Sequence, residues 1–177
     1  RAGSGNPGGA TTTTQEYDGS SWTSANAMSV ARTNGYFDGA QTAAIANAAE
    51  SPSAPDASGS ITKLTEQYDG TNWSSGTSGL FYLSSGGVSG GAAAQTAWMI
   101  AGGDGPNVTN NTGITQEYDG TAFASTAVLA TPRRQLNGGG TQAAGLVFGG
   151  TEASSSSLTA TEEYTGTTST ATASTLT

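Results

Sequence analysis

One six-residue phrase recurs four times along this chain at a nearly constant spacing. The tyrosines at its centre are 51, 50 and 46 residues apart. The four copies are Thr14-Gln-Glu-Tyr-Asp-Gly19, Thr65-Glu-Gln-Tyr-Asp-Gly70, Thr115-Gln-Glu-Tyr-Asp-Gly120 and Thr161-Glu-Glu-Tyr-Thr-Gly166. A period of about 50 residues is typical of β-propeller blades and related β-repeats. The sequence therefore predicts an all-β fold assembled from repeated blade-type units.

Other positions recur in register with the tyrosines. Five residues beyond the tyrosine stand Trp22, Trp73 and Phe123, with Ser169 in the fourth copy; further along come Met28, Gly79 and Leu129, then Arg32, Leu83 and Arg133. Each unit continues through an Ala/Gly-rich segment around Gln41, Gln95 and Gln142 and ends at Ala48-Ala49, Gly102-Gly103 and Gly149-Gly150. Several positions repeating together indicate a true repeat, not merely a biased composition.

The register divides the chain into a Gly/Thr-rich lead-in, three repeats and the start of a fourth. Their bounds are 1–13 (a lead-in or the end of a preceding repeat), 14–61, 62–113, 114–160 and 161–177. We expect strands near residues 14–18, 41–48, 61–69, 94–102, 114–119, 142–149 and 160–165. We expect almost no helix, because no segment keeps an apolar period of 3.6 residues.

Physical roles follow for the repeated positions. Asp-Gly tolerates the positive φ of a tight turn, so each Tyr-Asp-Gly and the aromatic after it should form two short strands around a turn. The apolar runs Ala97–Ala101 and Ala144–Phe148 should be inner strands covered on both faces. The repeated aromatic residues should form the structural core, namely Tyr17, Trp22, Tyr68, Trp73, Tyr118, Phe123 and Tyr164.

Charge and hydropathy exclude two classes of partner. The chain has 13 acidic and five basic residues, a net charge of −8, and its only pair of adjacent basic residues is Arg133-Arg134. That pattern lacks the basic patch of a nucleic-acid-binding protein. No apolar run approaches the roughly 20 residues of a membrane-spanning helix. We therefore expect neither nucleic acid nor a membrane span.

The chain contains no histidine and no cysteine. Ser-His-Asp and Cys-His nucleophiles, His-based metal sites and the commonest general base are therefore missing. The carboxylates Glu16, Glu66 and Glu117 sit at repeated positions, which spreads them over the fold instead of converging two of them on one bond. We expect no cofactor, no metal and a non-enzymatic role.

Ligand contacts are expected where the repeat is broken, because loops of unequal length on a repeating scaffold usually carry specificity. The candidate ligand-binding residues are Phe81, Tyr82, Asp104, Asn107 and Asn110. The recurring Arg32 and Arg133 are expected to tie one blade to the next through backbone carbonyls.

The order of an apolar strand ending in Gly-Gly, then Tyr, then Trp, then Met or Leu and an Arg resembles the kelch repeat. The third copy carries the pattern most fully, whereas the first has Ala48-Ala49 in place of the glycines and the second lacks the Met and Arg. The resemblance implies kelch-like β-propeller-type blades.

The Thr-rich sequence of the repeats is similar to kelch-like repeats in virion proteins of marine bacteriophages, such as tail fibres and other appendages. This resemblance implies a structural virion protein of a tail fibre, an appendage or the capsid surface, with host-surface glycan as a further partner. The alternatives are a secreted or cellular kelch-like interaction module and, third, a carbohydrate-active propeller enzyme.

Three full repeats and a half do not close a ring of four to eight blades. The chain opens at Arg1, and we expect it to be a processed product or part of a longer protein. Edges at either end invite pairing. We therefore expect identical copies, a longer chain or other virion proteins to complete the ring near Thr11–Tyr17 and Tyr164–Thr177.

Overall fold

The chain is built from β-strands, turns and loops. The computed structural model describes residues 9–51, 53–57, 61–81, 87–89, 94–105, 111–154, 156–166 and 172–176. Every regular element within those ranges is a β-strand. The expected all-β class with almost no helix is confirmed.

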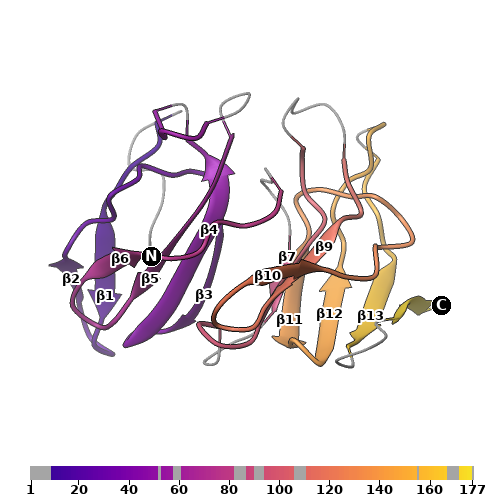
Figure 1. Cartoon of the computed structure of the whole chain (residues 1–177). Helices are drawn as coiled ribbons and strands as arrows, with labels where there is room; N and C mark the ends of the chain where they lie inside the picture. Colours follow the sequence, from indigo (N-terminus) through magenta and orange to yellow (C-terminus); the bar gives the residue numbers. More distant parts are fainter. Residues whose placement is uncertain are drawn as a thin grey trace.

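The strands form one hairpin and three four-stranded antiparallel sheets (Figure 1). The hairpin pairs β1 (Thr14–Tyr17) with β2 (Trp22–Ala25). The first sheet contains β3 (Tyr36–Ala40), β4 (Ala43–Glu50), β5 (Ile61–Tyr68) and β6 (Trp73–Ser75). The second contains β7 (Gly87–Ser89), β8 (Trp98–Ala101), β9 (Thr115–Tyr118) and β10 (Phe123–Ser125), and the third contains β11 (Asn137–Thr141), β12 (Ala144–Phe148), β13 (Thr161–Thr165) and β14 (Thr172–Leu176).

Each sheet is a meander in which consecutive strands pair. Figure 1 shows the sheets side by side along the chain, with β1–β2 at one end of the row and β14 at the other. Strand β7 lies beside β3, β11 and β12, so the first strands of the sheets are neighbours. The described residues thus form an open row of blade-like sheets, each taking strands from two successive sequence repeats.

The repeated phrase builds the same turn three times. In the second copy Asp69 Oδ1 accepts the backbone N–H groups of Thr71 and Asn72 at 2.8 and 2.7 Å. Gly70 has φ +92°, a conformation that L side chains rarely adopt. The turn delivers Trp73 opposite Tyr68, and their ring centroids are 5.1 Å apart.

The first strands of the sheets, β3, β7 and β11, were not among the expected strands. They contain Tyr36-Phe-Asp-Gly-Ala40, Gly87-Val-Ser89 and Asn137-Gly-Gly-Gly-Thr141. Strand β11 is rich in glycine, which has no side chain to pack, whereas β3 carries the strand-favouring Tyr36 and Phe37, a signal that the expected strands did not include. Their strand conformation comes from pairing with β4, β8 and β12.

Two further expectations need correction. The segment expected as a strand from 94 begins only at Trp98, because Ala94–Ala97 is a turn that carries Gln95 to the neighbouring sheet. Strand β8 is buried on both faces, whereas β12 is buried on one face only. On β12 the uncovered face follows from its place in the last described sheet of the row.

The core lies between the faces of neighbouring sheets. Trp98 is fully buried and clusters with Tyr36, Ile45, Tyr118 and Phe123. A second cluster joins Ala101, Leu129, Leu136 and Val147 between the second and third sheets. The repeats therefore bury their apolar surface against each other.

The doublets that end the apolar strands have positive φ, which explains their glycines. Gly102 and Gly103 have φ +70° and +102°, and Gly149 and Gly150 have +66° and +87°. In the first unit Ala48 and Ala49 take φ +52° and +137° despite their Cβ atoms. The tertiary contacts of that unit must offset the backbone strain of these two alanines.

Candidate functional site

The signature tyrosines join each unit to the one before it. The Tyr68 hydroxyl donates to Glu16 Oε1 at 2.5 Å, and the Tyr164 hydroxyl donates to Glu117. Between them, Gln67 Nε2 donates to the Tyr118 hydroxyl at 3.0 Å. The residue immediately before each tyrosine therefore serves as the docking point for the tyrosine of the next unit.

Burial and the carboxylate beside it both keep these phenols protonated. Burial, reinforced by the hydrogen bond to Glu16, raises the pKa of Tyr68 to about 12. Burial and Glu117 likewise raise the pKa of Tyr164 to about 12. A phenolate here would lose its hydration and face a like charge.

The second residue of the phrase makes a buried ion pair with the arginine of the preceding unit. Arg32 Nη2 lies 3.1 Å from Glu66 Oε2, and Arg133 Nη2 lies 2.6 Å from Glu162 Oε1. All four side chains are at most 2% exposed. Burial lowers the pKa of the Arg32 guanidinium, and the contact with Glu66 opposes that shift.

Backbone groups complete both pairs. Arg32 Nη1 donates to the carbonyls of Ala48 and Leu64, each at 2.9 Å. Glu66 accepts the backbone N–H groups of Ser29 and Val30 at 2.7 and 3.3 Å. The arginine therefore anchors the connection between β2 and β3 to the sheet that follows, through carbonyls as expected and also through a carboxylate.

The second pair repeats these contacts with different partners. Arg133 Nη1 donates to the carbonyls of Gly149 and Ala160 at 3.2 and 2.8 Å. Glu162 accepts the backbone N–H groups of Ala130 and Thr131 at 2.7 and 3.3 Å. The two buried pairs are therefore equivalent in chemistry as well as in position.

The middle interface makes the same backbone contact without a charge. Gln116 stands where Glu66 and Glu162 stand, and its Oε1 accepts the N–H of Leu80 at 2.9 Å. In the sequence register the arginine position of that unit is Leu83, which lies outside the described residues. Arginine and glutamate thus occur together in two units, and leucine and glutamine replace them together in one.

The turn aspartates Asp18, Asp69 and Asp119 also have structural partners. Hydrogen bonds from the backbone N–H groups two and three residues ahead lower the pKa of each carboxyl group. The repeated acidic side chains are therefore distributed among turns, tyrosine contacts and arginine pairs.

The candidate ligand residues that the structure describes lie inside the fold. Phe81 packs against the cluster around Trp98. Asp104 is buried and pairs with Arg134 at 3.5 Å, and desolvation raises the pKa of its carboxyl group. Tyr82, Asn107 and Asn110 lie outside the described residues.

Most of the repeated aromatics are covered, but the first pair is not. Tyr68, Tyr118, Phe123 and Tyr164 are buried, and Trp73 is partly buried with its indole N–H donating to Thr14 Oγ1 at 2.8 Å. Tyr17 and Trp22, which we expected in the core, are 47% and 56% exposed. They belong to the first unit, which has no preceding sheet among the described residues.

A cleft of about 430 Å³ lies between hairpin β1–β2 and the first sheet. Its lining combines aromatic rings with carboxylates and amides: Gln15, Glu16, Tyr17, Trp22, Phe37, Asp38, Gln41, Tyr68 and Trp73, among others. The cleft arises where the interface opens. Gln95 and Gln142 donate to the carbonyls of Tyr68 and Tyr118, but Gln41 makes no equivalent bond to Tyr17 in the part of the chain that the structure describes.

This cleft was not expected from the sequence, because Tyr17 and Trp22 were expected in the core and Gln41 in a strand. The feature of the sequence that could have indicated the cleft is the position of these residues in the first unit, where one face is exposed unless another unit covers it.

The described residues contain no group of His, Cys, Asp or Glu arranged to hold a metal ion. They also contain no helix that could span a membrane.

No family model matches this chain, and neither does any curated protein. Solved structures do match, 122 chains in all. One of them is the structure of YjhT, with 13% sequence identity and a TM-score of 0.70 over 86% of this chain. The match covers 48% of the YjhT chain, so this chain spans about half its length. At this identity the likeness is one of fold alone.

The raised pKa values predict a loss of stability in alkali. A phenol whose pKa is higher in the folded than in the unfolded chain contributes stability that is full below about pH 10 and is lost as the pH rises toward about 12. We expect the free energy of unfolding, measured in urea, to fall across that window. The Tyr68→Phe/Tyr164→Phe double variant should show a flatter profile there, and a slope equal to that of the unaltered protein would contradict this account.

Proposed function

We propose that this chain is a non-enzymatic structural protein whose blade-like sheets belong to a kelch-like β-propeller. The observation that carries the proposal is the use of the repeated acids. Glu66 and Glu162 are buried against arginines, and Glu16 and Glu117 accept from tyrosines of the next unit. These contacts hold the repeats together. Because the chain has no histidine or cysteine, an enzyme of this composition would need its acids for acid–base chemistry, and these four acids are already engaged in structural contacts.

The biological setting we propose is a bacteriophage particle, in a tail fibre, an appendage or the capsid surface. This setting is supported by the similarity of the repeat sequences to those of virion proteins of marine phages. Repeated sheets fastened by buried pairs suit a component that must stay folded outside the cell. A secreted or cellular kelch-like interaction module is the second reading. A carbohydrate-active enzyme is the third, and it would have to use acids other than Glu66, which is enclosed by its partners.

Imaging of purified phage particles with a labelled binder raised against this chain tests the setting. We expect label at a fixed place on the particle, on the tail, an appendage or the capsid surface. Label found only on non-viral material would contradict the virion setting. It would not bear on the proposal of a non-enzymatic, kelch-like structural protein.

We further propose that the cleft beside β1–β2 takes a host-surface glycan. Aromatic faces with neighbouring carboxylate and amide groups suit a ligand with both apolar and hydroxyl-bearing surfaces. The cleft volume of about 430 Å³ falls within the range of small-ligand sites.

A panel of bacterial surface oligosaccharides tests this, with NMR of the three tryptophan indole groups as the readout. We expect a binder to shift the indole signal of Trp73, and Gln41→Ala to weaken it by about tenfold. The matched control is Asn137→Ala, an exposed amide on β11 outside the cleft. Binding that leaves the Trp73 indole signal unchanged would contradict this location.

A further inference from the structure

The two ends of the row expose the two halves of a contact that recurs inside it. In each internal interface the tyrosine of one unit meets the residue before the tyrosine of the preceding unit. At the start of the row the Tyr17 hydroxyl donates to the carbonyl of Gly19 in its own turn at 2.8 Å, as Tyr118 does to Gly120, but no residue of a preceding unit meets it among the described residues. At the end of the row the corresponding residue is Glu163, which is exposed and makes no hydrogen bond or ion pair among the described residues.

The neighbouring tryptophan follows the same pattern. The Trp73 indole donates to Thr14, the first residue of the phrase in the preceding unit. Trp22 occupies the Trp73 position in the first unit and is 56% exposed. The threonine position in the last sheet is Thr161, which is only partly buried. Donor and acceptor therefore stand at opposite ends of the row.

The apolar surface at the end of the row also lacks a cover. Leu146 and Phe148 on β12 correspond to Met99 and Ala101 on β8, each of which is 1% exposed beneath the next sheet. Phe148 is 43% exposed. A face that is fully covered in the preceding sheets is thus open in the last one, beside Glu163.

We propose that a second copy of this chain docks head to tail on this face. The Tyr17 hydroxyl of one copy donates to Glu163 of the other, the Trp22 indole donates to Thr161, and the hairpin covers Leu146 and Phe148. The docking continues the interface already made three times within the chain, and it does not depend on the virion setting. Figure 1 places β1–β2 and β13 at opposite ends of the row, so each copy offers one half of the contact at each end.

A charge exchange in the 177-residue chain tests the register. Tyr17→Glu sets two carboxylates against each other, and Glu163→Lys removes the acceptor, so each variant should weaken association by about ten- to a hundredfold. The Tyr17→Glu/Glu163→Lys double variant places opposite charges across the interface and should restore association. Sedimentation over a concentration series measures all three, with an expected mass of two 17.4 kDa chains for the unaltered protein.

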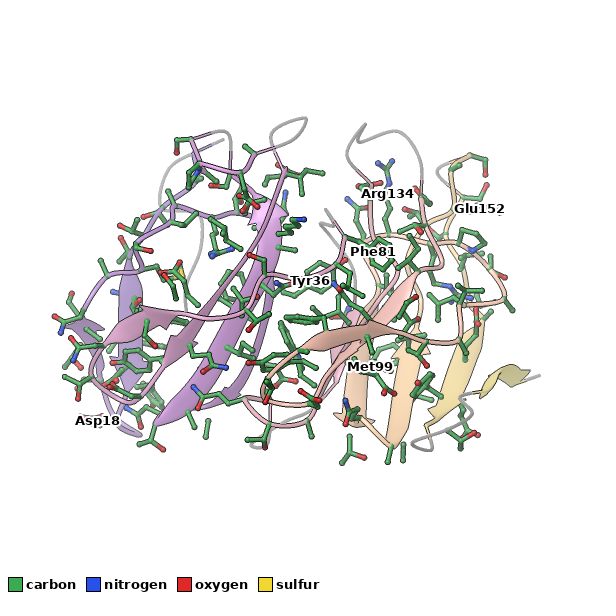
Figure 2. The ribbon with its side chains drawn as sticks, viewed as in Figure 1. Asp18, Tyr36, Phe81, Met99, Arg134 and Glu152 are labelled. Atoms are coloured by element: carbon green, nitrogen blue, oxygen red, sulfur yellow. The ribbon has the colours of Figure 1, made fainter. Side chains whose placement is uncertain are left out.

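Both substituted residues are exposed, so the variants should keep the far-UV spectrum of the unaltered chain. The matched control is Glu152→Lys, which makes the same charge change in a loop of the third sheet (Figure 2). It should leave association unchanged. A monomer at every concentration would overturn the proposal, and so would association that is insensitive to both single variants or a double variant no stronger than either.

Discussion

The guanidinium groups of Arg32 and Arg133 are fully buried, and a buried charge is tolerated only when a partner and hydrogen bonds replace its water. In this chain the partner is always the glutamate two residues before the tyrosine of the next unit. Because the pair joins the connecting segment to two strands of the following sheet, it sets how each sheet follows the last. The tyrosine contacts form between sheets that the ion pairs hold in this arrangement, and so do the contacts of the strands that end in glycine doublets.

The middle unit shows the same constraint without charge. Leu83 and Gln116 stand where the other units have arginine and glutamate, and Gln116 keeps the backbone contact to Leu80. A lone buried carboxylate at this position would carry the desolvation penalty without compensation. If arginine and glutamate stabilise the fold only as a pair, both should be replaced together, as they are in the middle unit.

Much of the fold was readable from the sequence, because the phrase repeats and Asp-Gly specifies its turn. The hairpin strands around Tyr68 and Tyr118 were predicted from that phrase. Strands β3, β7 and β11 were not, although β3 and β11 each pair with the strand that follows across a two-residue turn. In β11 the glycines hid the strand, because they have no side chain that favours it. The cleft was missed for a related reason. Burial of Trp73 and exposure of Trp22 depend on whether another unit precedes them, which the residues themselves do not encode.

A double-mutant cycle on Arg32 and Glu66 tests most directly whether the buried pair acts as one unit. Arg32→Leu and Glu66→Gln should each lower the free energy of unfolding by roughly 3–5 kcal/mol, because each leaves a buried charge alone. The double variant reproduces the leucine and glutamine of the middle unit and should lose at least about 2 kcal/mol less than the sum. Arg32→Leu combined with Glu152→Gln should be additive, since these two residues share no contact. Additive losses for Arg32 and Glu66 would contradict the account, because the pair would then not be the coupling on which the repeat depends.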